Sequence, residues 1–237
     1  DIEDGSLYYT EQITSGDELE TGAVVMSELG LTLINSPENP YSLDGARIAL
    51  QYGVEIAEGT FEYVPLGIFY VTEIKRNIDT VTLTAFDGML LLDKDISGVI
   101  TSGNARDLVL SLTARCGVSL ATTSAQFAEL ANYSTMLTLP AASKVKTCRD
   151  LLMWVCMATA TSARFNRQGK LELISMTGRA PVRTIPADDR YIDNVSDNYV
   201  KITQITMQIG EKTYSAGEDG LTLELDENPL MIGKSES

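Results

Sequence analysis

The sequence predicts an α+β protein that is mainly β, and three observations support this. Residues 1–97 hold several segments of strand character separated by short turns, with no helical pattern between them. Two later segments follow helical spacing instead, and strand character then returns after residue 198. Segments in this order favour an antiparallel barrel or sandwich with a small α/β unit over a βαβ fold. The length of 237 residues allows one large domain or two modest ones.

Strict alternation marks the clearest strand, at residues 80–86. Val81, Leu83 and Ala85 alternate with threonines, so we expect one face of this strand to be buried. Glycine, proline and asparagine residues mark the turns before it. The other expected strands in this region are Leu7–Thr14, Ala23–Ile34, Arg47–Ile56 and Thr60–Ile74.

Capping patterns locate two helices in the middle of the chain. A capping residue is followed three positions later by an aspartate at Asn104 with Asp107, and again at Thr147 with Asp150. Apolar residues at helical spacing follow each start. We therefore expect one helix at Ala105–Cys116, ended by Gly117, and a second from Thr147 to about Ala160.

The remaining strands are expected around a connector. Thr161–Phe165 and Lys170–Ile174 flank an Asn-Arg-Gln-Gly turn and predict a β-hairpin. Prolines and an acidic pair make residues 176–198 suitable as a connector. A strand at residues 200–209, with a β-bulge near Thr203, and another at Leu221–Leu225 complete the pattern.

These elements divide the chain into three predicted parts. Residues 1–97 form a β-barrel-like domain, and residues 98–190 form an α/β helical insertion domain. Residues 191–237 supply the first strands of a second barrel-like domain that is cut short.

The net charge argues against two classes of partner. The chain has 18 Lys and Arg against 33 Asp and Glu, which gives −15 and an isoelectric point near 4.3. Affinity for nucleic acid and for anionic membranes comes mainly from basic side chains. We therefore expect neither sequence-specific nucleic-acid binding nor stable membrane anchoring, and the sequence has no run of 18 apolar residues.

The absence of histidine removes much of the usual catalytic repertoire. Ser-His-Asp triads, Cys-His dyads and histidine-containing metal sites all require a residue that the sequence lacks. Cys116, Cys148 and Cys156 match no zinc spacing, so we expect buried, reduced thiols.

Carboxylate pairs are the remaining candidates for chemistry, because two carboxylates suffice for glycoside hydrolysis. The pairs are Asp93 with Asp95, Asp188 with Asp189, and Glu18 with Glu20. None lies in a recognisable catalytic context, and exposed surface carboxylates are the simpler interpretation. The residues around Asp93 lack the glycine and glutamate of a calcium loop, and no phosphate-binding glycine loop occurs. We expect no enzyme activity, no metal site and no cofactor.

Aromatic residues leave two alternatives open. Phe61, Tyr63, Phe69 and Tyr70 could form a platform for a sugar or peptide, although packing across strands is the expected role. A carbohydrate-binding module would need Tyr63, Phe69 or Tyr70 exposed together in one concave patch. Trp154 is expected to make a contact between domains rather than to bind a ligand.

Two motifs in the first part of the chain have a recognisable order. The first is Pro65-Leu66-Gly67-Ile68-Phe69-Tyr70-Val71. The second runs from Asp79 through Ala85-Phe86-Asp87 to Met89 and is followed by Leu92-Asp93. In this order they resemble motifs of bacteriophage and prophage tail proteins of the baseplate-hub and tail-tip group. Residues 6–34 and the Asp226-Glu227-Asn228-Pro229-Leu230 segment are also similar to that group.

The resemblance implies two barrel-like domains per subunit and a homotrimer whose six barrels form a ring. Such a ring joins a six-fold tail tube to a three-fold tip, so the implied partners are tail tube or distal tail proteins and the tip or spike. The implied location is the virion tail, after synthesis in the bacterial host cytoplasm. An acidic channel wall would pass DNA without gripping it.

Under this interpretation the functional residues belong to subunit interfaces. Exposed strand edges invite pairing with a neighbouring subunit, so the strands at 65–71 and 200–209 are the expected ring-forming segments. The expected interface residues are Pro65, Leu66, Phe69, Val71, Ile202, Ile205 and Met207. The alternative is the non-catalytic N-terminal portion of a tail-associated peptidoglycan-degrading enzyme, and a carbohydrate-binding module is a weaker one.

Overall fold

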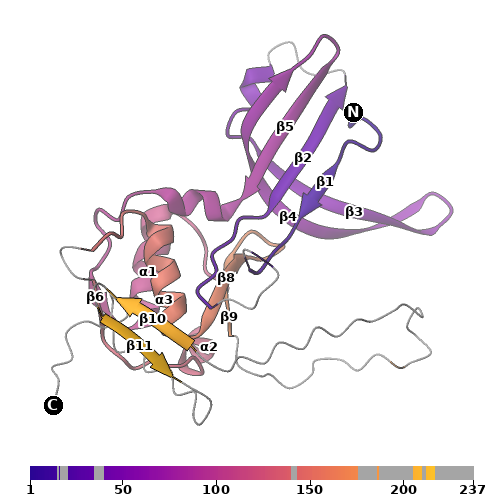
Figure 1. Cartoon of the computed structure of the whole chain (residues 1–237). Helices are drawn as coiled ribbons and strands as arrows, with labels where there is room; N and C mark the ends of the chain where they lie inside the picture. Colours follow the sequence, from indigo (N-terminus) through magenta and orange to yellow (C-terminus); the bar gives the residue numbers. More distant parts are fainter. Residues whose placement is uncertain are drawn as a thin grey trace.

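The structure is a computed structural model, and it describes residues 1–14, 16, 21–34, 40–139, 143–175, 186, 205–209 and 212–216. A five-stranded antiparallel sheet precedes an α/β unit in the chain, and the two lie next to each other (Figure 1). The fold class is therefore α+β and mainly β, as the sequence predicts.

The sheet has the strand order β1-β2-β5-β4-β3, and every neighbouring pair is antiparallel. Its strands are β1 (Tyr8–Thr10), β2 (Glu28–Ile34), β3 (Arg47–Ala57), β4 (Thr60–Arg76) and β5 (Thr80–Asp87), with a short 3₁₀ helix, η1 (Pro40–Leu43), before β3. Within the described residues β1 and β3 are the two edges and do not pair with each other, so the sheet is open rather than a closed barrel.

The buried face of β5 is the one that alternation predicts. Val81, Leu83 and Ala85 are at most 3% exposed. They form one apolar core with Leu29 and Leu31 of β2 and with residues of β3 and β4. This core holds the sheet unit together.

The α/β unit follows directly from the end of β5. Its helices are η2 (Gly88–Asp93), α1 (Ala105–Cys116), α2 (Ser124–Ala128) and α3 (Cys148–Ala158). Its strands are β6 (Ser102–Gly103), β7 (Leu137–Thr138), β8 (Thr161–Phe165) and β9 (Leu171–Ser175), paired as β6 with β7 and β8 with β9. No helix in the described part of the chain is long and apolar enough to cross a membrane.

Both predicted helix starts are confirmed. The Asn104 side chain accepts a hydrogen bond from the Asp107 backbone N–H at 3.0 Å, and Gly117 ends α1 with φ +72°. Thr147 and Asp150 form a reciprocal capping box at the start of α3.

A second apolar core lies inside the α/β unit. It takes residues from η2, α1, α2, α3, β8 and β9, and Trp154 packs against it from a partly buried position. Met89 and Leu92 belong to this core although they precede residue 98, the predicted start of the insertion domain. The change from one core to the other therefore occurs at Gly88, directly after β5.

One predicted strand is divided between the two units. Residues 23–34 read as a single strand, but β2 begins only at Glu28. The backbone before it runs beside β8 instead: the Gly22 N–H donates to the Thr161 carbonyl at 2.8 Å, and the Ala163 N–H donates to the Ala23 carbonyl at 2.9 Å. The segment between β1 and β2 thus ties the sheet unit to the α/β unit.

The C-terminal part of the chain is described only in one hairpin. β10 (Ile205–Ile209) pairs with β11 (Lys212–Ala216), and the predicted strand at 200–209 overlaps β10. The predicted bulge near Thr203 and the predicted strand Leu221–Leu225 lie outside the described residues.

Candidate interaction surface: a projecting hairpin arm

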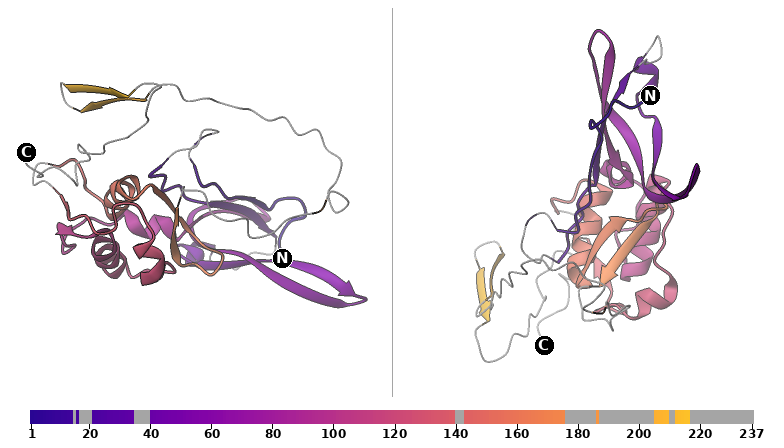
Figure 2. Two further views of the ribbon diagram at one scale, coloured as in Figure 1. Left: turned by 90° about the horizontal axis from the view of Figure 1, so that it is seen from below. Right: turned by 90° about the vertical axis from the view of Figure 1, so that its right-hand side faces the viewer.

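The most prominent feature of the surface is the part of the β3–β4 hairpin that extends past the sheet. β5 pairs with β4 only from Phe69 to Arg76, whereas β3 pairs with β4 as far as Thr60. We call residues 51–65 the arm. It projects beyond the other strands on the side away from α1 and α3 (Figures 1 and 2). Both long edges of the arm lack a neighbouring strand among the described residues.

The arm is held in its hairpin conformation by local interactions. Ala57 pairs with Thr60, which leaves a two-residue turn in which Gly59 has φ +71°. The Glu55 carboxylate accepts the Gly59 N–H at 2.8 Å. The Tyr63 ring covers Gly53 on the opposite strand, where a β-carbon would lie 3.0 Å from it. The sequence thus forms a defined two-stranded hairpin.

Both faces of the arm carry exposed apolar side chains. Opposed residues of an antiparallel pair share a face, so Tyr52 and Val64 lie on one side and Tyr63 lies on the other. Tyr52 and Tyr63 are each 61% exposed. The exposed apolar residues of the arm are Tyr52, Val54, Ile56, Phe61, Tyr63 and Val64. Such a concentration at one projection is typical of a protein contact surface.

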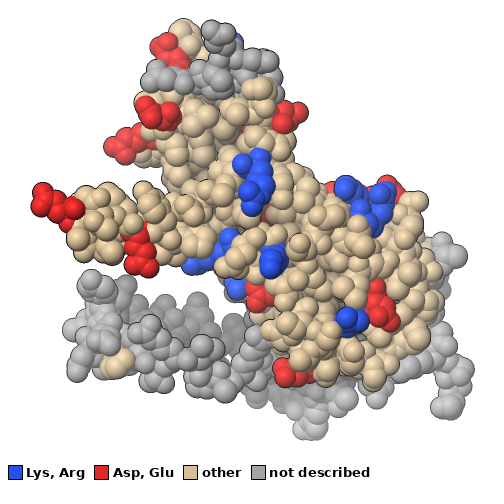
Figure 3. Space-filling view, turned by 180° about the vertical axis from the view of Figure 1, so that it is seen from behind, with Lys and Arg blue, Asp and Glu red and all other residues tan. Residues whose placement is uncertain are grey.

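The charge of the arm has one sign. Glu55, Glu58 and Glu62 are its charged residues, and residues 51–65 contain no Lys or Arg. The arm is the projection at the left of Figure 3, where its charged atoms are red. The arm therefore presents apolar groups framed by carboxylates.

The predicted interface residues on β4 fall into two groups. Pro65 is exposed and Leu66 half-buried at the base of the arm, where β4 pairs with β3 alone. Phe69 and Val71 are 1% and 3% exposed and belong to the core of the sheet.

The expectation that residues 65–71 form an exposed edge needs correction for the second half of the segment. Phe69, Tyr70 and Val71 pair with β5, and β3 lies on their other side. The order β2-β5-β4-β3 is a tertiary outcome that strand periodicity does not encode. The accessible residues of this hairpin lie nearer its tip, and they are not among the interface residues that the sequence predicts.

The arm contains none of the predicted C-terminal interface residues. Ile205 and Met207 belong to β10, and Ile202 lies outside the described residues. Their role in an interface stays a prediction.

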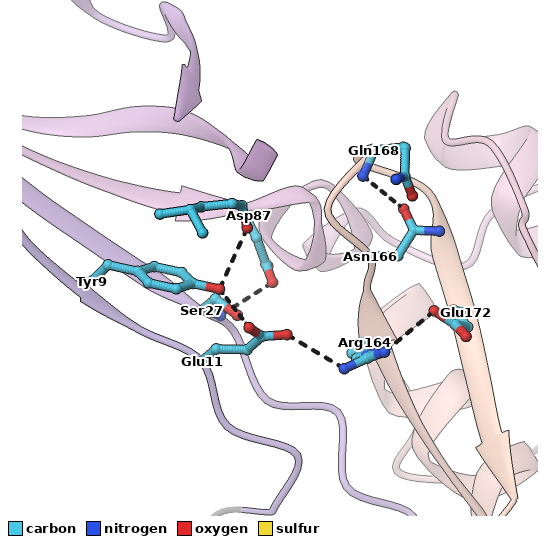
Figure 4. A network of polar contacts seen from close by, with 9 residues as sticks. Tyr9, Glu11, Ser27, Asp87, Arg164, Asn166, Gln168 and Glu172 are labelled. Atoms are coloured by element: carbon cyan, nitrogen blue, oxygen red, sulfur yellow. Dashed lines mark hydrogen bonds and ion pairs between the residues drawn. The ribbon is translucent and has the colours of Figure 1, made fainter. Parts of the chain in front are cut away.

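A polar joint connects the base of the sheet to the α/β unit (Figure 4). The Tyr9 hydroxyl donates to Glu11 at 2.7 Å, and Glu11 accepts from Arg164 of β8 at 3.3 Å. Arg164 also pairs with Glu172 of β9 at 3.7 Å. Burial and the neighbouring Glu11 raise the pKa of Tyr9, so its hydroxyl keeps its proton at neutral pH.

Asp87 is the buried carboxylate of this joint. It accepts the backbone N–H groups of Ser27 at 3.1 Å and Met89 at 2.9 Å. Burial raises the pKa of Asp87, and these two hydrogen bonds oppose the increase. These contacts give Asp87 a structural role, since they fix the start of η2.

The carboxylates considered for catalysis have structural partners where they are described. Asp93 pairs with Arg149 at 2.7 Å and Asp95 pairs with Arg115 at 2.9 Å. Asp188, Asp189, Glu18 and Glu20 lie outside the described residues. No cluster of three or more potential metal ligands occurs in the part of the chain that the structure describes.

The structure also shows whether the cysteines and the candidate aromatic residues are buried or exposed. Cys116, Cys148 and Cys156 are free and buried, as predicted, and burial raises the pKa of Cys156 to about 12. The carbohydrate-binding alternative needs Tyr63, Phe69 or Tyr70 exposed together in one concave patch; Phe69 lies in the core, whereas Tyr63 is exposed on the arm.

Comparison with solved structures shows a fold similarity, whereas the sequence comparisons find no match. No family model matches the chain, and no curated protein matches it. The chain is similar to a 43 kDa tail protein of prophage MuSo2 from Shewanella oneidensis, with 12% identity and a TM-score of 0.39. The match covers 65% of this chain and 47% of that one, so the chain spans about half the length of its neighbour.

Proposed function

We propose that this chain is a structural component of a phage or prophage tail tip, where it forms part of a trimeric baseplate-hub ring between the tail tube and the tip. The observation that carries the proposal is the arm, with apolar side chains on both faces and two edges that pair with no other described strand. A chain that exposes such a surface gains stability by covering it with another subunit.

The motifs that resemble tail-tip proteins support the same function. Pro65 lies at the base of the arm, where β4 pairs with β3 and with no other described strand. Proline within sheets is typical of such edge positions, because it has no N–H to donate. Ala85 and Asp87 end β5 at the change from the first core to the second. The residues that carry the resemblance therefore build the base from which the arm projects.

Locating the protein in purified tails tests the tail-tip function. We would add an epitope tag to the chain in the phage or prophage that encodes it and image antibody-labelled tails by electron microscopy. Label at one end of the tail is the expected result. Label along the whole tube, or tails without label, would overturn the proposal.

The trimer has a separate test. Light scattering over a wide concentration range should give a species of three times the 25.8 kDa chain mass. A species of another stoichiometry would exclude the trimeric ring. The tail location would then still be tested by the imaging experiment.

A further inference from the structure

Charge is divided unequally between the two structural units. Residues 1–87 contain 16 Asp and Glu against 3 Lys and Arg, a net charge of −13. Residues 88–175 contain 6 Asp and Glu against 9 Lys and Arg, a net charge of +3. The overall charge of −15 therefore conceals an acidic sheet unit and a basic α/β unit in one chain.

Four of the nine basic residues of the α/β unit belong to the region where the chain after η2 meets the C-terminal end of α1 and the segment before α3. Asp95 pairs with Thr147 in an isolated β-bridge, and the Cys148 N–H donates to the Lys94 carbonyl at 2.8 Å. Lys94 donates to the Cys116 carbonyl at the end of α1 at 3.3 Å. We call the exposed cations at this junction the basic patch: Lys94, Arg115, Lys144 and Lys146.

The carboxylates near the basic patch neutralise it only in part. Asp95 is bonded to Arg115, and Asp93 is bonded to Arg149 beside the patch. Asp150 accepts backbone N–H groups from Lys146 and Thr147. Burial opposes the ionisation of Asp150, but these contacts outweigh it and lower the pKa of Asp150, so it keeps its negative charge. The three lysines of the patch outnumber this one carboxylate, so an excess of positive charge remains at the surface.

An apolar side chain accompanies the basic patch. Ile100 is 41% exposed and its N–H donates to Ser111 on α1 at 3.0 Å. Ser111 is one helical turn before Arg115, so the two share a face of α1. The surface thus combines positive charge with an apolar group, and the arm combines negative charge with apolar groups.

The arm and the basic patch cannot meet within one chain. The arm projects away from α1 and α3, and the patch lies at the ends of those two helices (Figures 1 and 2). Complementary surfaces at separate places on one molecule join copies head to tail, which gives a ring where the rotation closes. Contact between two arms would instead bring like charges together.

We infer that the arm of one copy docks on the basic patch of a second copy of this chain, with Glu58 and Glu62 facing Lys144 and Lys146. This inference rests on the proposed function and names the two surfaces that form the subunit contact.

Paired charge reversals test the contact. We would prepare Glu58→Lys with Glu62→Lys on the arm, Lys144→Glu with Lys146→Glu on the patch, and a chain with all four changes. Among the described residues, Glu58 and Glu62 make no hydrogen bond that holds the hairpin, unlike Glu55. The matched control is Asp44→Lys with Asp79→Lys, two exposed residues of the sheet unit outside the arm that give the same change in net charge.

Sedimentation velocity of the whole chain gives the dissociation constant of self-association. Each double reversal should weaken association by about tenfold or more, because like charges then face each other. The fourfold variant should return to near the wild-type value, and the control should match wild type. Circular dichroism shows whether each variant is folded. If a double variant does not fold, the two single-substitution variants are measured in its place.

Three results would overturn the inference. Association that survives the arm reversal means that the arm is not at the contact, and failure of the fourfold variant to recover means that the two surfaces do not face each other. A wild-type chain that stays monomeric at all concentrations excludes self-docking by the arm. The tail-imaging experiment is independent of all three, so the proposed tail location succeeds or fails separately.

Discussion

Asp87 and Gly88 are the residues at which one core gives way to the next. The Asp87 carboxylate at the end of β5 accepts the backbone N–H groups of Ser27 and Met89. At Gly88 the backbone lies directly beside the Phe165 ring. A β-carbon on Gly88 would lie 2.3 Å from an atom of that ring, which is itself 6% exposed. The chain therefore needs its smallest residue here because another unit packs over it.

Gly88→Ala should lower the free energy of unfolding by about 1 to 3 kcal/mol, because Phe165 or the backbone must move to admit the methyl group. Urea unfolding followed by circular dichroism measures the change. The matched control is Gly16→Ala, where a β-carbon would have no neighbour within 4 Å. Equal stability of the two variants would contradict the close packing at Gly88.

Asp87 should make stability depend on pH in a definite direction. Its pKa is raised in the folded chain from the ordinary value of 3.8, so the unfolded chain ionises first as the pH rises. The contribution of this carboxyl is fully present below the unfolded pKa and is lost as the pH rises through the folded pKa.

The stability of wild type relative to Asp87→Asn should consequently fall over that pH range. Urea unfolding of both proteins at a series of pH values between about 3 and 7 measures the difference. The variant has no titratable group at position 87 but keeps all other carboxylates. The difference between the two proteins therefore reports Asp87 alone. A difference that grows with pH would mean that the hydrogen bonds outweigh burial.

At the scale of elements, the chain uses one strand for two purposes. The base of β4 fills the core of the sheet through Phe69, whose ring meets Tyr9 edge-on with centroids 5.7 Å apart. The outer part of β4 belongs to the arm and exposes Phe61 and Tyr63. The core part of β4 begins at Phe69, the first residue of β4 that pairs with β5.

Aromatic truncation should separate these two parts of β4. Phe69→Ala should cost about 3 to 5 kcal/mol of folding free energy, since it opens a cavity. Tyr63→Ala should change stability by less than about 0.5 kcal/mol, since the side chain is exposed. Thermal unfolding compares them, with Phe69→Leu as the milder variant if Phe69→Ala does not fold. A large loss at Tyr63 would mean that the arm supports the fold.

The capping box of α3 is a local element whose strength can be measured alone. Thr147 accepts the Asp150 N–H at 3.1 Å, and Asp150 accepts the Thr147 N–H at 3.0 Å. Thr147→Ala should lower the free energy of unfolding by about 1 kcal/mol. Thr101→Ala, at an exposed threonine, is the control in the same urea titration. A variant as stable as this control would show that the cap contributes nothing.

At the scale of the whole molecule, the separation of charge determines how copies approach each other. An acidic sheet unit and a basic α/β unit attract across a head-to-tail contact and repel across a symmetric contact between arms. Salt screens both interactions, because the Debye length falls from about 10 Å at 0.1 M to about 3 Å at 1 M.

Self-association should therefore weaken as sodium chloride is raised. Sedimentation velocity at several salt concentrations should give a dissociation constant that rises with salt and levels off where the apolar contacts remain. The control is the charge-reversed patch variant, whose association should respond to salt in the opposite sense. Association that strengthens with salt in the wild-type chain would indicate a contact between like charges.

The sequence determined the elements whose signals are local. Alternation at Val81, Leu83 and Ala85 identified the buried face of β5, and capping residues located α1 and α3, because both patterns depend on residues within one turn or one strand. The three buried thiols and the absence of histidine were equally visible.

Only the tertiary structure decided which apolar faces are covered. Tyr52, Val54 and Ile56 alternate as a half-buried strand does, yet all three are exposed, because β5 stops pairing with β4 at Phe69 and no described strand extends along the arm. Residues 23–27 read as part of a strand, yet Ala23 pairs with β8 of the other unit. Periodicity in the sequence predicts that a side chain is suited to burial. Which partner buries it depends on contacts between distant parts of the chain or between chains.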